Sequence, residues 1–161
     1  QVHQTLAPAM DIQVASNFER FLYYYFEQDS QRLNAFMSDF AATGRATLGA
    51  APDTALFEAV AIDQLQTLSV MRSIKAQFGY VLDPHTAIGV AAAQRVCTAE
   101  EPVLCIATAH PAKFPEAVKE ATDTVPTHPT LDRLSGLPQR KNMLDADLAA
   151  VKAFLAESVV A

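Results

Sequence analysis

Residues 103–108 constrain this chain more than any other segment, because an apolar run there leads directly into a polar turn. Such a run predicts a buried strand. Thr108, His110 and Lys113 follow at its end, with a hydroxyl, an imidazole and an ammonium group. Ligands of open α/β sheets bind beyond the carboxyl ends of the strands. We therefore expect a ligand or cofactor site at this turn, although the spacing alone does not name the ligand.

The rest of the chain is dominated by helical periodicity. Ser16 and Glu19 have the spacing of a capping box, Gly44 and Gly79 are typical of helix ends, and Asp83 stands before a proline as an N-cap does. Apolar residues at helical spacing predict helices over about residues 16–26, 30–43, 63–78, 84–96, 115–121 and 145–158.

Two of these helices have strongly apolar faces. Aromatic residues recur through the first one, and its two extra tyrosines, Tyr23 and Tyr24, predict burial on two sides. The last helix is expected to direct four apolar side chains inward, namely Leu148, Val151, Phe154 and Leu155. Core packing explains both faces better than a ligand or a membrane does.

This inventory predicts an α/β fold that consists mostly of helices around a partial sheet. Only residues 103–108 form a clear strand, with residues 5–14 and 80–82 as weaker candidates. A buried strand needs hydrogen-bond partners along both edges, and this sequence supplies too few. We therefore expect residues 1–161 to form a single, partial domain completed by polypeptide outside this sequence. A helical bundle with one edge strand is the alternative.

Composition excludes several classes of partner. The net charge is −6 and the twelve Lys and Arg residues are scattered, so we expect no nucleic acid partner. No apolar run approaches the roughly 20 residues of a membrane span, so we expect no membrane partner. Cys97 and Cys105 lack metal-ligand spacing and the four histidines are dispersed, which predicts no metal site, two buried thiols and a cytoplasmic location. Residue 1 is glutamine, so we expect the gene product to begin upstream.

Three segments resemble the threonine synthase family, in the family's order and at similar spacing. They are residues 5–20 (TLAPAMDIQVASNFER), 79–90 (GYVLDPHTAIGV) and 107–114 (ATAHPAKF). Together they extend across much of residues 5–118, and the later helices agree with the family's C-terminal portion. The chain thus resembles the last third of such an enzyme.

The resemblance implies a tryptophan-synthase-β-like fold, with residues 1–161 in the C-terminal part of the large cofactor-binding domain. It implies a lyase of threonine biosynthesis that uses pyridoxal 5′-phosphate to convert O-phosphohomoserine and water into threonine and phosphate. The family's cofactor-binding lysine motif and phosphate loop are absent from this sequence. The resemblance therefore implies no catalytic residue in this chain, an inactive isolated chain, and the missing N-terminal part of the same enzyme as its partner.

The resemblance also implies contacts with the cofactor. Thr108 matches the family position that hydrogen-bonds the pyridine nitrogen, with Ala109 and His110 in the turn beside it. Asp83 begins a helix at the opposite edge of the ring, where free amides and the positive end of the helix dipole are available. Structural alternatives remain open: Thr108 ends a strand, His110 orients a turn, and Asp83 is an ordinary N-cap.

Ser16, Asn17 and Arg20 are candidates for substrate binding. They open another helix, where backbone amides and a guanidinium group suit an anionic substrate. The resemblance identifies that substrate as O-phosphohomoserine. Capping by Ser16 and Glu19 explains part of this pattern without a ligand.

Two functions follow from these expectations. The first is the C-terminal segment of a threonine synthase. The alternative is a stand-alone, non-catalytic small-molecule-binding or interaction domain derived from that family. A β-replacement enzyme acting on another amino acid is a third possibility, against which residues 16–20 and 83–89 favour threonine synthase.

Overall fold

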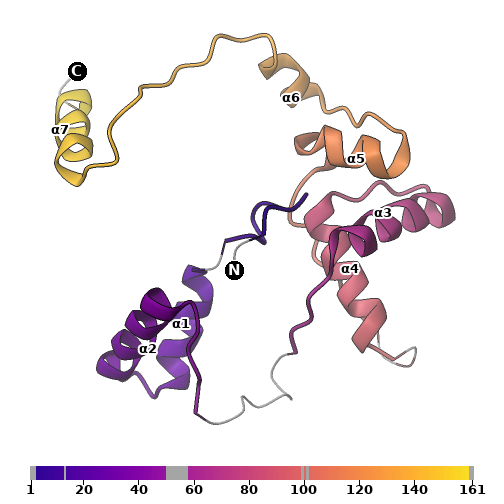
Figure 1. The fold of residues 1–161 in the computed structure, drawn as a ribbon. Helices are drawn as coiled ribbons and strands as arrows, with labels where there is room; N and C mark the ends of the chain where they lie inside the picture. The colour runs from indigo at the N-terminus through magenta and orange to yellow at the C-terminus, as the bar shows by residue number, and fades with distance from the viewer. Residues whose placement is uncertain (1–2, 13, 50–57, 99, 101, 160–161) are drawn as a thin grey trace. The chain divides into compact units, whose positions relative to one another are not determined.

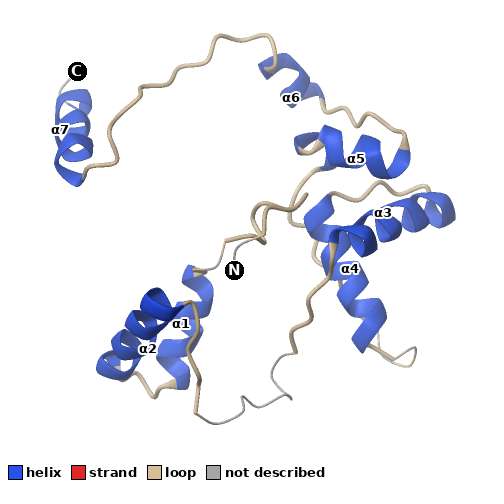
Figure 2. Cartoon of the chain, in the orientation of Figure 1, coloured by secondary structure: helices blue, strands red, loops and turns tan. Residues whose placement is uncertain are grey.

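The chain is helical in the computed structural model, which describes residues 3–12, 14–49, 58–98, 100 and 102–159 (Figures 1 and 2). It divides into two compact units, Gln1–Thr127 and His128–Ala161. The helices are α1 (Ser16–Tyr25), α2 (Ser30–Thr43), α3 (Gln64–Phe78), α4 (Pro84–Val96), the short 3-10 helix η1 (Pro111–Lys113), α5 (Pro115–Thr122), α6 (Pro129–Leu134) and α7 (Leu148–Val159).

Local chemistry places most helix ends where the sequence predicts them. Asp63 and Gln66 form a full capping box at α3, in which each side chain accepts a hydrogen bond from the other residue's amide, at 2.8 and 3.0 Å. Gly44 and Gly79 follow α2 and α3 with φ of 71° and 67°, a left-handed conformation that glycine adopts without strain. The predicted ends at residues 43 and 78 are confirmed.

The capping box predicted at α1 is wrong. Ala15 is the N-cap, and its carbonyl oxygen accepts from the amides of Phe18 and Glu19, both at 3.0 Å. No side chain caps this helix. Because Ala15 takes the N-cap position, Ser16 is the first helical residue, and its hydroxyl cannot take the capping position.

A small apolar core lies between α3, α4 and α5 (Figure 1). Met71 of α3 and Val118 of α5 are fully buried, and Ala87 and Ala91 of α4 are short enough to let the helices approach closely. The core cluster consists of Leu68, Met71, Leu82, Ala87, Val118 and Ala121. Leu6 packs against it from the N-terminal segment.

Two cations of α3 bind the carboxyl end of α5. The Nε atom of Arg72 donates to the carbonyl oxygen of Ala121 at 3.1 Å, and Nζ of Lys75 donates to that of Thr122 at 2.6 Å. These carbonyls lie in the last turn of α5, where the helix dipole favours positive charge. The two contacts therefore hold α3 and α5 together beyond their apolar contact.

The helices α1 and α2 pack through aromatic residues. Leu22 and Phe26 are buried, and the rings of Phe26 and Phe36 lie 5.7 Å apart between their centroids. Tyr24 is 64% exposed, so the predicted burial of α1 on two sides is wrong for the described residues. Its amino-terminal Phe18 is also exposed.

The predicted strand over residues 103–108 does not form. No backbone hydrogen bond joins this segment to another described residue, and Leu104 and Ile106 are 84% and 66% exposed. Residues 5–14 and 80–82 form no strand over their described positions either, and the former contains a turn closed by a 2.8 Å bond from the Met10 amide to the Ala7 carbonyl. A strand needs partners along its edges, and the described residues supply none, so the partial sheet is absent from this structure.

The second unit differs from expectation in two respects. Residues 129–134, for which the sequence predicts no helix, form α6, in which Pro129 takes the first helical position and His128 Nδ1 accepts from the Thr130 amide at 3.3 Å. The face of α7 that was expected to be buried is open: Leu148 and Leu155 are 69% and 54% exposed. No described element covers this face, which explains the difference.

Cysteine exposure also departs from the prediction. Cys97 is exposed at the end of α4, whereas Cys105 is partly buried, with its Sγ 3.9 Å from the carbonyl oxygen of Gly89. No described helix is long and apolar enough to cross a bilayer. Within the part of the chain that the structure describes, no three His, Cys, Asp or Glu side chains are grouped so that they could hold a metal ion.

Candidate functional site

One buried carboxylate organises the first turn of α4. Asp83 is 1% exposed and precedes Pro84, which has no amide hydrogen to satisfy at the first helical position. Its Oδ1 accepts from the amide of His85 at 2.9 Å and lies 3.0 Å from Nδ1 of the same residue. Its Oδ2 accepts from the Thr86 hydroxyl. Both carboxylate oxygens are therefore occupied within the start of the helix.

His85 connects this turn to two distant segments. Its Nε2 accepts from the backbone amide of Ala9 at 3.2 Å, and its ring lies against the ring of Phe114 with centroids 4.7 Å apart. An amide N–H can only donate, so Nε2 carries no proton. The imidazole is therefore neutral, and its single proton lies on Nδ1, from which it is donated to Asp83.

The three sequence segments that resemble the threonine synthase family meet at His85. Ala9 comes from the first segment, Asp83 and His85 from the second, and Phe114 from the third. Leu6 of the first segment and Phe114 of the third also line one cavity of about 360 Å³. Residues that are far apart in the chain thus form a single junction at the amino end of α4.

The predicted cofactor residues in the third segment lie just before η1. Thr108 and His110 are exposed, and Ala109 is partly buried. Nδ1 of His110 accepts from the amide of Ala112 at 3.1 Å, so this histidine caps η1. His110 therefore has the turn-forming role that was its structural alternative. Thr108 is the last residue of the segment 103–108, which forms no backbone hydrogen bond with another described residue.

The predicted substrate residues lie together on the first turns of α1. Ser16, Asn17 and Arg20 are all exposed, and Nη1 of Arg20 donates to Oδ1 of Asn17 at 3.2 Å. None of the hydrogen bonds found between described residues links this group to Asp83 or Thr108. The structure thus forms two predicted clusters, one on α1 and one around α4 and η1.

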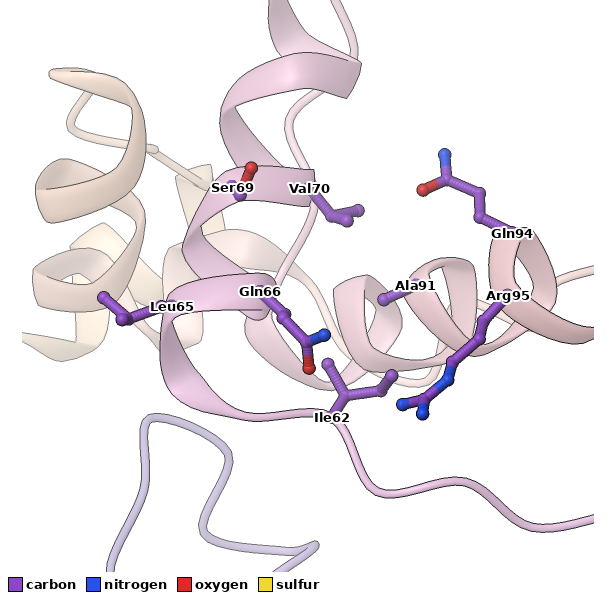
Figure 3. A pocket seen from close by; sticks show the side chains of 8 residues that line it. All are labelled: Ile62, Leu65, Gln66, Ser69, Val70, Ala91, Gln94 and Arg95. Atoms are coloured by element: carbon purple, nitrogen blue, oxygen red, sulfur yellow. The ribbon is translucent and has the colours of Figure 1, made fainter.

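A larger cavity of about 630 Å³ lies between α3 and α4 (Figure 3). In the close view, Arg95 extends from α4 toward Ile62, and its Nη1 donates to the carbonyl oxygen of Ala61 at 3.4 Å. The lining residues are Ile62, Leu65, Gln66, Ser69, Val70, Ala91, Gln94 and Arg95. None of them is a predicted site residue, so this cavity is separate from the candidate site.

Sequence reasoning identified Asp83 but not the junction around it. The bond between Ala9 and His85 joins residues 76 positions apart, and no local pattern predicts such a pair. The signal that was available is the coincidence that Ala9, His85 and Phe114 each lie in a segment that resembles the same family.

Comparison with known proteins agrees with that resemblance. A family model described as "Threonine synthase, C-terminal" matches residues 86–155. The threonine synthase of Pseudomonas aeruginosa is 36% identical over 97% of this chain and 34% of that protein, and that of Methylobacillus glycogenes is 32% identical over 98% and 34%. A solved structure of threonine synthase from Brucella melitensis with bound PLP has a TM-score of 0.80 and 35% identity, over 98% of this chain and 35% of that one.

These likenesses first define a class of protein. Almost the whole chain is similar to enzymes that are much longer, since it spans about a third of the length of the curated relatives it matches. Over almost its whole length, the chain is similar to threonine synthases, and the family model that it matches describes their C-terminal part.

Proposed function

We propose that this chain forms the C-terminal part of an enzyme that uses pyridoxal 5′-phosphate to convert O-phosphohomoserine and water into threonine and phosphate. The observation that carries the proposal is the match of 97% of the chain to a threonine synthase at 36% identity. The likeness to a PLP-bound threonine synthase supports the choice of cofactor. The cytoplasmic location and the single, partial domain stay predictions.

The donor set around Thr108 fits a pyridine ring. The hydroxyl of Thr108 is exposed and makes no hydrogen bond with a described residue, and a hydroxyl can pair with a ring nitrogen. Thr108 makes this contact, Ala109 and His110 form the turn beside the ring, and Asp83 fixes the first turn of α4 at the site. Pyridoxal 5′-phosphate, when bound, supplies an electron sink for the reaction.

The pairing of the Thr108 hydroxyl with the ring nitrogen of the cofactor would also favour one type of reaction. Unlike a carboxylate, Thr108 carries no negative charge that would hold a proton on the ring nitrogen. The cofactor is then a weaker electron sink, which suits elimination and replacement better than transamination. The loss of phosphate and the addition of water, as proposed here, belong to that first group.

Arg20, Ser16 and Asn17 are proposed to bind the anionic end of the substrate. They are exposed at the amino end of α1, where backbone amides and the helix dipole attract anions. The bond from Arg20 to Asn17 restrains the guanidinium group, which can then pair with phosphate oxygens. The phosphate of O-phosphohomoserine is the group that fits this end of the helix.

The upstream part of the same enzyme is the proposed partner of residues 103–108. The backbone of this segment forms no hydrogen bond with another described residue, and Val103, Leu104 and Ile106 are exposed. Apolar residues of that kind are expected to enter a sheet, because pairing satisfies the backbone and burial removes the apolar surface from water. The upstream part would also supply the lysine and the phosphate loop that this sequence lacks.

The proposal is tested with the full-length protein that contains this chain. We expect the purified protein, saturated with pyridoxal 5′-phosphate, to release threonine and phosphate in equal amounts from O-phosphohomoserine. Homoserine, which has no phosphate to lose, is the matched control and should yield no threonine. A protein that binds the cofactor and forms no threonine from O-phosphohomoserine would contradict the proposed function.

A further inference from the structure

We propose that His85 is a positioning residue, whose neutral imidazole fastens the loop at residues 5–11 to the amino end of α4. Through this loop and through Phe114 it sets the positions of the α1 amino terminus and of residues 108–110. The fastening itself is independent of the proposed function. The roles of the positioned residues in binding substrate and cofactor rest on the proposed function.

The loop at residues 5–11 is a folded unit in its own right. The carboxylate of Asp11 accepts from both the amide and the hydroxyl of Thr5, each at 2.8 Å, and the Met10 amide donates to the Ala7 carbonyl at 2.8 Å. A loop closed in this way moves as one body. Leu6 of this loop packs against the apolar core, and among the described residues the hydrogen bond from Ala9 to His85 is the polar contact that attaches the loop to α4.

The imidazole of His85 is held on three sides. Asp83 accepts from Nδ1, the Ala9 amide donates to Nε2, and Phe114 lies against the ring, which is itself 5% exposed. Both nitrogens are used, so neither is available to transfer a proton to or from a substrate. His85 therefore acts through the segments that it joins and is a positioning residue, not a catalytic one.

The two segments joined to His85 lead directly to the candidate site residues. The closed loop ends at Asp11, a few residues before Ser16 in α1. Phe114 immediately follows η1, which His110 caps. Loss of the bond to Ala9 would release the loop at residues 5–11 and leave the packing of Phe114 largely intact.

Two substitutions separate the two hydrogen bonds of His85. In His85→Asn, the side-chain amide nitrogen falls near the position of Nδ1, which retains the donor to Asp83 and removes the acceptor for Ala9. In His85→Gln, the longer side chain places its carbonyl oxygen near the position of Nε2, which retains the acceptor for Ala9. His128→Asn, which makes the same replacement at a histidine in the second unit, is the control.

Hydrogen exchange at residues 7–11 of the full-length protein, followed by mass spectrometry, is the primary measurement. We expect exchange about tenfold faster in His85→Asn, within about threefold of wild type in His85→Gln, and unchanged in the control, because the bond to the Ala9 amide is lost only in the first variant. Unchanged exchange in His85→Asn would contradict the proposal that His85 holds the loop at residues 5–11. Equal acceleration in the Asn and Gln variants would overturn it as well, because the ring would then only fill space.

Steady-state kinetics with O-phosphohomoserine tests the positioning. We expect the KM of His85→Asn to rise by about tenfold with a smaller change in kcat, and His85→Gln to recover most of the loss. Faster exchange without any change in KM or kcat would overturn the positioning. If wild-type protein makes no threonine while the exchange pattern holds, the proposed function fails and the fastening stands.

Discussion

Lys75 joins α3 to the end of α5 through its ammonium group. Its Nζ donates to the carbonyl oxygen of Thr122 at 2.6 Å and to the hydroxyl of Thr124. We expect Lys75→Met, which retains the apolar stem, to lower the free energy of unfolding by about 1–2 kcal/mol because these acceptors lose a charged donor. Urea denaturation measures the change. Lys141→Met, at an exposed loop position, is the control, and equal losses in both variants would contradict the prediction.

Thr108 permits a test of the proposed cofactor contact. In the full-length protein, Thr108→Val removes the hydroxyl and preserves the shape of the side chain. We expect kcat/KM to fall by about tenfold because one hydrogen bond to the ring is lost, and Thr108→Ser to retain most of the activity. Steady-state kinetics and the absorption spectrum of the bound cofactor provide the measurements. A Val variant with wild-type kinetics and spectrum would argue against the contact.

Single-residue roles were the least accessible to sequence reasoning. Asp83 was expected at the start of a helix, and it is there, because a cap depends on amides two and three residues away. The role of Ser16 in a capping box was predicted by the same rule and is wrong, because Ala15 occupies the cap. The contact of His85 with Ala9 could not be predicted, since it depends on how separate segments pack.

At the scale of helices and strands, the clearest test is whether residues 103–108 form a strand in the full-length protein. We expect the amides of this segment to exchange with solvent at least about 100-fold more slowly in the full-length protein than in the isolated chain, because strand pairing would protect them. Hydrogen exchange with mass spectrometry measures the ratio. Residues 138–144, an exposed loop, provide the reference segment and should exchange fast in both forms. Fast exchange of residues 103–108 in the full-length protein would show that no strand forms there.

Helices were predicted more accurately than strands for a physical reason. A helix satisfies its backbone hydrogen bonds within a few residues, so α2, α3, α4 and α5 follow from their own sequences and caps. A strand depends on a second strand, and the apolar run at residues 103–108 has none among the described residues. The short helix α6 is not predicted from the sequence because a proline is typical of loops as well as of helix starts, and Pro129 occupies the first helical position.

At the scale of the whole molecule, the chain leaves many of its large apolar side chains exposed. Large apolar side chains remain open to solvent in both compact units, among them Leu65, Leu104, Met143 and Leu148. We expect the isolated chain to bind a hydrophobic dye and to self-associate, because such surface is normally covered. The full-length protein should bind several-fold less dye per molecule. Dye fluorescence with gel filtration measures both, and a monomeric isolated chain with little dye binding would contradict the prediction.

Local chemistry was sufficient for most of the helices and their ends. The caps at Asp63 and Asp83 and the stops at Gly44 and Gly79 involve only neighbours within about four residues, so the order of the amino acids specifies them. Tertiary structure decided the junction at His85 and left residues 103–108 without a strand partner among the described residues. The junction needs a hydrogen bond between residues 76 positions apart, and a strand at residues 103–108 would need a second strand from elsewhere in the sequence. No local pattern predicts where such distant segments lie.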